Sequence, residues 1–166
     1  MKLLIKKDQW FKNEFEGTDI IYADKKLLKN ILINLLSNAI KFSSEGAEIK
    51  LVTNANENET NISIIDRGIG ISEKDQKHLF SSFFRGANAN NIQGTGLGLH
   101  IVKTYTELLG GKVSVESKLN EGSKFSFTLT LKIPDKDAKP QNITPQSLTA
   151  RSEEPPILIE SAAINT

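Results

Sequence analysis

The chain contains no cysteine, and its only histidines among 166 residues are His78 and His100. Without cysteine it can form no disulfide, no thiolate nucleophile and no Cys-ligated zinc site. The two histidines are far apart in the sequence, and neither belongs to an HExxH pattern of the kind that binds zinc in metalloproteases. The sequence therefore supports neither redox chemistry nor metalloprotease chemistry.

Strong charge of one sign and long apolar runs are also missing. The formal net charge is +1, which creates no field for holding a polyanion, so we expect no nucleic-acid partner. No run approaches the roughly 20 apolar residues that a membrane span needs, and Met1 to Trp10 lacks the apolar core of a signal peptide. We therefore expect a cytoplasmic chain without direct membrane contact.

Proline is absent from the first 133 residues, and all five prolines lie at Pro134 or beyond it. Because residues 134–166 are also rich in Ser, Thr and Glu, we expect a disordered or linker tail there. Its short apolar run, Ile157 to Ile159, leaves a docked strand as the alternative. Residues 9–133 then form one domain, and residues 1–8 are a remnant of an N-terminal linker.

Apolar periodicity predicts the elements of this domain. Asp24 to Phe42 repeats apolar residues at helical spacing, and Leu97 to Leu109 is a second helix that ends at two glycines. Strand patterns cover residues 9–15, 20–22, 48–53, 61–66, 113–117 and 124–132, while short helical turns follow Ser72. This order predicts an α+β two-layer sandwich, with helices on one face of a mixed, mostly antiparallel sheet.

The first predicted helix carries Asn34, Asn38 and Lys41 within about 60° of arc, along one border of its apolar stripe. Amide oxygens suit a hydrated Mg²⁺, and the lysine suits a phosphate. A solvated helix edge is the simpler interpretation of these three residues alone.

The next candidate feature is Asp66-Arg67-Gly68-Ile69-Gly70, at the end of a predicted strand. The Asp66 carboxylate can accept a hydrogen bond from an exocyclic amine such as that of adenine. Gly68 and Gly70 would let the backbone approach a flat base. An ordinary turn explains an Asp before Gly equally well.

A glycine-rich segment runs into the second long helix, and its free N–H groups favour a phosphate. It fits neither the GxGxxG dinucleotide motif nor the GxxxxGK[ST] P-loop. The small polar residues of 85–93 before it suit a mobile lid, although a plain surface loop is the alternative. The segment consists of Gly94, Thr95, Gly96, Leu97, Gly98 and Leu99.

An aromatic cluster, Phe80, Phe83 and Phe84 with Arg85, precedes the predicted lid. Such clusters more often belong to the core. We assign no chemical role to His78 or His100, because no nucleophile or metal-ligand partner stands at a recognisable spacing from either.

Taken in order, these features resemble the catalytic domain of sensor histidine kinases, in the superfamily of gyrase, heat-shock chaperone, histidine kinase and mismatch-repair ATPases. Residues 30–42 look like the family's N box, 66–70 like its G1 box, 80–85 like its F box and 94–99 like its G2 box. Glu121-Gly122-Ser123 resembles its closing glycine turn. The resemblance implies the Bergerat fold, with a flexible ATP lid.

The same resemblance implies Mg²⁺ and ATP as ligands and assigns roles to the site residues. Asn38 would ligate the Mg²⁺, Asn34 and Lys41 would attend the phosphates as catalytic residues, and Asp66 would bind the adenine amine. The other cofactor-binding residues would be Gly68, Gly70, Arg85, Gly94, Thr95, Gly96, Leu97, Gly98 and Leu99.

One position separates the branches of this superfamily. The hydrolases carry a glutamate four residues before the metal-binding asparagine, and here that position holds Asn34. An amide cannot take a proton from water at neutral pH, so we expect phosphoryl transfer to a protein rather than efficient hydrolysis. A histidine kinase catalytic domain is the first interpretation. An anti-sigma-type serine kinase and a non-catalytic nucleotide-sensing module are the alternatives.

Kinases of this family carry their acceptor histidine on a helical hairpin before the catalytic domain, and only a few residues precede it here. We therefore expect the chain as given to bind ATP without phosphorylating itself. Its expected partner is a histidine-containing dimerisation domain, in cis or in trans, with a response-regulator receiver domain as a further one. It would then be cytoplasmic, or the cytoplasmic part of a membrane-bound sensor.

Overall fold

The computed structural model describes residues 9–17, 20–21, 23–56, 58–89, 92, 94–130 and 157–158. Helix α1 (Lys25–Phe42) begins at Asp24, whose carboxylate accepts hydrogen bonds from the backbone N–H groups of Lys26 at 2.8 Å and Leu27 at 3.0 Å. This cap satisfies two of the donors that every helix start leaves unpaired. The apolar stripe of α1 is buried through Leu28, Ile31, Leu35 and Ala39. The helix predicted over residues 24–42 is confirmed.

The main sheet has five strands in the order β1-β3-β4-β6-β5. β1 (Trp10–Gly17) runs parallel to β3 (Glu48–Ala55), and the other neighbours, β3 with β4 (Glu59–Asp66), β4 with β6 (Gly122–Thr130) and β6 with β5 (Val113–Lys118), are antiparallel. The mixed, mostly antiparallel sheet is therefore confirmed. A separate two-stranded sheet pairs β2 (Ile20–Ile21) with β7 (Ile157–Leu158), which lies within the predicted tail. The rest of 134–166 and residues 1–8 lie outside the described residues.

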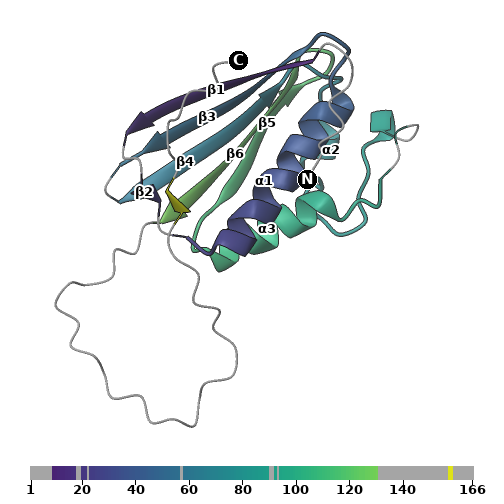
Figure 1. The fold of residues 1–166 in the computed structure, drawn as a ribbon. Coiled ribbons are helices and arrows are strands. Elements are labelled where there is room, and N and C mark those ends of the chain that lie inside the picture. Colours follow the sequence, from purple (N-terminus) through teal and green to yellow (C-terminus); the bar gives the residue numbers. More distant parts are fainter. Residues whose placement is uncertain are drawn as a thin grey trace, which may run out of the picture.

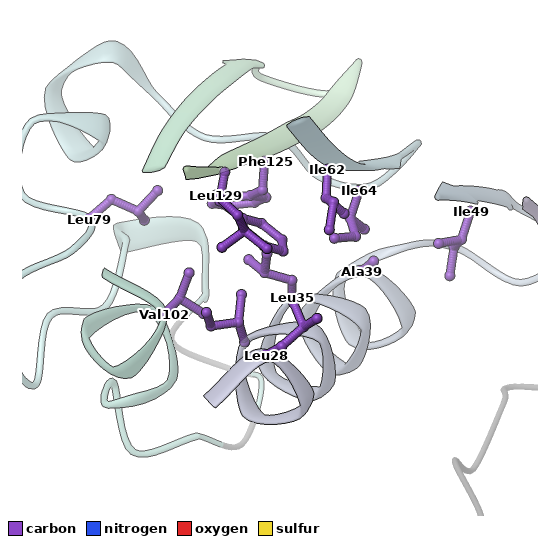
Figure 2. Close-up of a cluster of buried hydrophobic side chains, with 12 residues drawn as sticks. Leu28, Leu35, Ala39, Ile49, Ile62, Ile64, Leu79, Val102, Phe125 and Leu129 are labelled. Carbon is purple, nitrogen blue, oxygen red and sulfur yellow. The ribbon is translucent and has the colours of Figure 1, made fainter. Parts of the chain in front are cut away.

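Helices α1 and α3 (Gly98–Leu108) lie side by side on one face of the five-stranded sheet (Figure 1). Their apolar side chains point at those of the central strands (Figure 2). Phe127, Ile31, Leu35 and Ile64 are among the largest completely buried side chains of this interface. The core thus fills the space between one sheet face and two helices, as the two-layer prediction requires.

The short helix α2 (Glu73–Gln76) starts at Ser72, whose hydroxyl accepts a hydrogen bond from the Asp75 N–H at 3.2 Å. A single 3-10 turn, η1 (Ala87–Ala89), follows it before α3. In the described ranges, no helix is both long and apolar enough to cross a membrane.

The aromatic cluster before η1 divides into core and surface members. Phe80 and Phe84 pack against the core, as the core interpretation predicts. Phe83 does not, because it is 72% exposed. Its φ of 62° places it in the left-handed region, which non-glycine residues occupy mainly in turns. The turn directs this one ring away from the core.

Candidate functional site

A cavity of about 310 Å³ lies beside the C-terminal half of α1. Other walls come from the end of β4 and the turn after it, the glycine-rich segment and the start of α3. This volume lies at the lower end of the range of about 300–1,000 Å³ that is typical of small-molecule sites. Gly68 and Leu97 are the two predicted site residues that do not line it. Those that do are Asn34, Asn38, Lys41, Asp66, Gly70, Arg85, Gly94, Thr95, Gly96, Gly98 and Leu99.

The polar edge of α1 faces the glycine-rich segment directly. The Asn34 amide nitrogen donates to the Asn30 carbonyl at 2.8 Å, which leaves its Oδ1 beside Gly98. A Cβ built on Gly98 would lie 2.8 Å from that Oδ1, and one built on Gly94 would lie 2.9 Å from Lys41 Nζ. A larger residue at either position would therefore displace the ends of the Asn34 and Lys41 side chains from the places they occupy beside the glycine-rich segment.

Two cationic side chains, Lys41 and Arg85, line the same cavity. Partial burial lowers the pKa of Lys41, and the nearby Arg85 guanidinium lowers it further. Because the two positive charges repel each other, each makes the charged form of the other less stable in the ligand-free protein. A polyanionic ligand such as a triphosphate would relieve this repulsion.

Asp66 is the last residue of β4 and is only 6% exposed. Burial raises the pKa of its carboxyl group to about 6, although hydrogen bonds from the backbone N–H groups of Gly68 and Ser123 oppose the shift. The Gly68 N–H lies 2.9 Å from Asp66 Oδ1. The strand register pairs Asp66 with Ser123 of β6. A carboxylate held this way in a cavity wall can recognise a hydrogen-bond donor on a buried ligand.

The chain after Asp66 is fixed against the end of α1. Gly68 pairs with Ser43 through an isolated β-bridge, and the Ile69 N–H donates to the Phe42 carbonyl at 3.2 Å. Gly68 thus holds this segment in place from outside the cavity lining, whereas Gly70 reaches the cavity itself. At Gly70 φ is +64°, and a Cβ would lie 1.9 Å from the Lys118 carbonyl oxygen. Only glycine fits this position.

The segment predicted as a lid is described through residue 89 and again at Ile92. Arg85 donates to the carbonyls of Ala89 at 2.7 Å and Ile92 at 2.6 Å. Asn88 donates to the Gly70 carbonyl at 2.8 Å. These bonds place the lid segment across one side of the cavity. Asn90, Asn91 and Gln93, which the prediction also included, lie outside the described residues.

The glycine-rich segment leads into the N-terminus of α3. Leu97 is the cap residue, with no side-chain capping bond, and its N–H lies 3.4 Å from the Thr95 hydroxyl. Gly98 and Leu99 of the first turn line the cavity, so the helix start is directed at it. Helix starts present unpaired N–H groups and favour anions.

Sequence reasoning missed several residues of the lining. Ser123 and Phe125 come from β6 and reach the cavity because β6 is the sheet neighbour of β4, a pairing that sequence patterns leave open. The sequence identified Glu121-Gly122-Ser123 only as a turn. The alternation of side chains along the strand that follows was the one signal that could have placed Ser123 and Phe125 on the same face. The remaining unassigned lining residues are Ser37, Phe42, Ile69, Ile71, Leu79, Phe84, Gly86, Asn88, Ala89 and Ile92.

A family profile described as histidine kinase-, DNA gyrase B-, and HSP90-like ATPase matches residues 23–133. The chain belongs to this family. The matched range contains every residue that lines the cavity. The predicted family and its fold class are therefore confirmed for this ATPase-family chain.

Curated relatives show which members of the family this chain is similar to. It is 44% identical over 109 residues to the sensor histidine kinase YcbM of Bacillus subtilis, covering 64% of this chain and 35% of YcbM. It is 39% identical over 122 residues to the hybrid signal transduction histidine kinase B of Dictyostelium discoideum, covering 70% of this chain and 6% of that protein. The ATPase-family chain thus spans only a minor part of these relatives.

Solved structures agree with the family assignment. The mycobacterial sensor histidine kinase MprB superimposes with a TM-score of 0.62 at 29% identity, over 71% of this chain and 83% of that one. Full-length ShkA in complex with AMPPNP superimposes with a TM-score of 0.59 at 28% identity, over 72% of this chain and 25% of that one. The fold of this ATPase-family chain is that of histidine kinase catalytic domains.

Proposed function

We propose that residues 9–133 are the ATP-binding catalytic domain of a sensor histidine kinase. The domain binds Mg-ATP and donates the γ-phosphoryl group to a histidine on a separate dimerisation domain. One observation carries the proposal: Asp66, Asn34, Asn38 and Lys41 line a single cavity that the glycine-rich segment borders. Sensor histidine kinases among the relatives, and AMPPNP in the ShkA complex, support it.

Adenine is the base that suits the Asp66 end of the cavity. Its exocyclic amine donates to the carboxylate, whereas guanine presents a carbonyl at the equivalent position. Ile69, Ile71 and Phe125 supply apolar lining to the same cavity. The triphosphate then extends towards Lys41 and the start of α3, where positive charge and free N–H groups favour it.

The donor set near α1 fits a hydrated Mg²⁺ held through the nucleotide. Mg²⁺ prefers oxygen ligands and keeps several waters when it binds phosphates. Asn38 would supply an amide oxygen. Across the described ranges, no three His, Cys, Asp or Glu side chains gather as a metal cluster. When bound, the ion would neutralise charge on the phosphates.

Asn34 favours transfer over hydrolysis. It occupies the place where hydrolases of the superfamily carry a glutamate, and its amide nitrogen is already engaged with the Asn30 carbonyl. An amide at this position cannot remove a proton from an attacking water. The residues present can bind and orient the nucleotide and neutralise its charge, and a separate domain supplies the acceptor.

The acceptor and the setting follow from the same proposal. The partner is a histidine-containing dimerisation domain, in cis or in trans, and a response-regulator receiver domain takes the phosphoryl group next. The domain operates in the cytoplasm, as the cytoplasmic part of a sensor or on its own.

Calorimetry followed by a transfer assay tests the function. We expect a non-hydrolysable ATP analogue to bind more tightly with Mg²⁺ than without it. Labelled ATP should then mark a cognate histidine hairpin with acid-labile phosphate and leave the chain alone unmarked. Acid-stable phosphate on the partner would identify a serine acceptor instead, and binding without any transfer would reduce the domain to a nucleotide sensor.

A further inference from the structure

The hydroxyl of Ser117, on β5, makes three close polar contacts behind the Asp66 end of the cavity. It accepts from the Ile71 N–H at 2.9 Å, and it lies 2.8 Å from the Gly122 carbonyl oxygen and 2.9 Å from the Ser123 hydroxyl. Ser117 itself does not line the cavity, whereas Ser123 and Ile71 do. It therefore touches the wall of the site from behind.

Only one arrangement of protons makes all three contacts hydrogen bonds. A serine hydroxyl has one proton to donate and two lone pairs to accept with. The Ile71 N–H can only donate and the Gly122 carbonyl can only accept, so the Ser117 proton goes to Gly122. Ser123 must then donate its own proton to Ser117. Towards the cavity, the Ser123 oxygen can therefore only accept hydrogen bonds.

The consequence is a pair of acceptors side by side in the cavity wall. Ser123 is the strand partner of Asp66, and the two are 7% and 6% exposed. A ligand edge that presents a donor meets two acceptors here. A carbonyl on the ligand edge meets the same two acceptors, and the acceptor that it faces is left without a partner, which is unfavourable in a buried place.

We propose that Ser117 is a positioning residue that sets purine specificity by fixing the Ser123 hydroxyl as an acceptor. This rests on the proposed function, since it assumes that a purine base occupies the Asp66 end. Ser117 acts through Ser123 and touches no ligand. While Asp66 is ionised, the site selects a 6-amino purine over a 6-oxo purine, because neither wall group can then donate to the C6 substituent.

The test compares affinities for ATP and inosine triphosphate, which carries a carbonyl where adenine carries the amine and an N–H at N1 where adenine has a bare nitrogen. Ser117→Ala frees the Ser123 proton to rotate towards the cavity and donate to that carbonyl. The wild type should prefer ATP, and the variant's preference should fall by about 3- to 10-fold, the worth of one hydrogen bond. Ser117→Thr keeps a hydroxyl and should retain the preference. Ser114→Ala, an exposed serine of the same strand, is the matched control.

A second substitution separates positioning from general damage. In a Ser123→Ala background, adding Ser117→Ala should leave the ratio of the two affinities unchanged, because the hydroxyl that Ser117 orients is gone. Equal weakening of both nucleotides by Ser117→Ala alone, or an unchanged ratio, overturns the positioning role while leaving ATP binding established. A wild type that binds neither nucleotide overturns the proposed function, and this role with it.

Discussion

A carboxylate buried as deeply as that of Asp66 destabilises the fold whenever it is ionised without a ligand. Burial raises its pKa from 3.8 to about 6, so the folded protein holds this proton more tightly than the unfolded chain does. Protonation of Asp66 thus stabilises the fold at low pH. This contribution is lost as the pH rises from about 4 through 6.

Replacing Asp66 by asparagine should remove this pH dependence. We expect the free energy of unfolding of Asp66→Asn, relative to the wild type, to increase by up to about 3 kcal/mol between pH 4 and pH 7, the equivalent of the pKa shift. Urea unfolding of the ligand-free proteins at a series of pH values measures it. Parallel stability curves for the two proteins would show that burial does not shift Asp66.

Nucleotide binding should favour the ionised form of Asp66, whereas folding favours the protonated form, because the ionised carboxylate is the better hydrogen-bond acceptor for the adenine amine. We expect the preference for ATP over inosine triphosphate to decline as the pH falls from 7 to 5, through the pKa of about 6. Taking the ratio of the two cancels the titration of the phosphates themselves. Calorimetry of the wild type and of Asp66→Asn measures this, and a pH-independent ratio in the wild type would remove Asp66 from base recognition.

Sequence patterns predict the position of Asp66 well and its neighbourhood poorly. The Asp-x-Gly-x-Gly spacing marks the residue, whereas its acceptor partner Ser123 depends on the pairing of β4 with β6. That pairing joins segments more than 50 residues apart, and alternation along a strand does not specify which strand lies beside it.

At the scale of elements, α1 contributes most to the cavity because one helix edge presents Asn34, Asn38 and Lys41 together. The Asp24 cap, the apolar stripe and this polar edge are all local patterns, and each was predictable. The parallel pairing of β1 with β3 was not, since no hairpin turn connects them and α1 lies between them in the chain. Local signals specify elements, and tertiary contacts decide their partners.

The metal role of α1 can be tested with two asparagines of the same helix. We expect Asn38→Ala to lose the Mg²⁺-dependent part of ATP affinity, roughly tenfold or more, because a ligand to a charged group is removed. Asn30→Ala is the control, since Asn30 is exposed and outside the cavity lining. Calorimetry with and without Mg²⁺ measures both, and melting curves check folding. Equal behaviour of the two variants would contradict the assignment of Asn38.

The turn after β4 can be tested with two glycines of similar, positive φ. Gly70 and Gly46 have φ of +64° and +71°, but a Cβ at Gly70 would collide with the Lys118 carbonyl, whereas at Gly46 it would meet open space. We expect Gly46→Ala to cost about 1–2 kcal/mol of stability and Gly70→Ala at least about 3 kcal/mol. Denaturant unfolding measures the difference. Similar losses would mean that the β4 turn and the end of β5 are not in close contact.

At the scale of the whole molecule, one sheet face and two helices build the core, and the cavity lies at one end of that interface. Its walls come from α1, the turn after β4, the lid segment, the start of α3 and the start of β6. The order of four sequence boxes was enough to predict that these segments meet. Only the tertiary structure reveals the details of this meeting: Phe83 is exposed, and Gly68 supports the site from outside the cavity lining.

The central claim is that a Mg-nucleotide is seated between the asparagine edge of α1 and the glycine-rich start of α3. A crystal structure of the chain with Mg²⁺ and a non-hydrolysable ATP analogue tests it most directly. The account predicts the adenine amine within hydrogen-bonding distance of Asp66 and the metal ion beside Asn38. A nucleotide bound elsewhere, or a base turned away from Asp66, would contradict it.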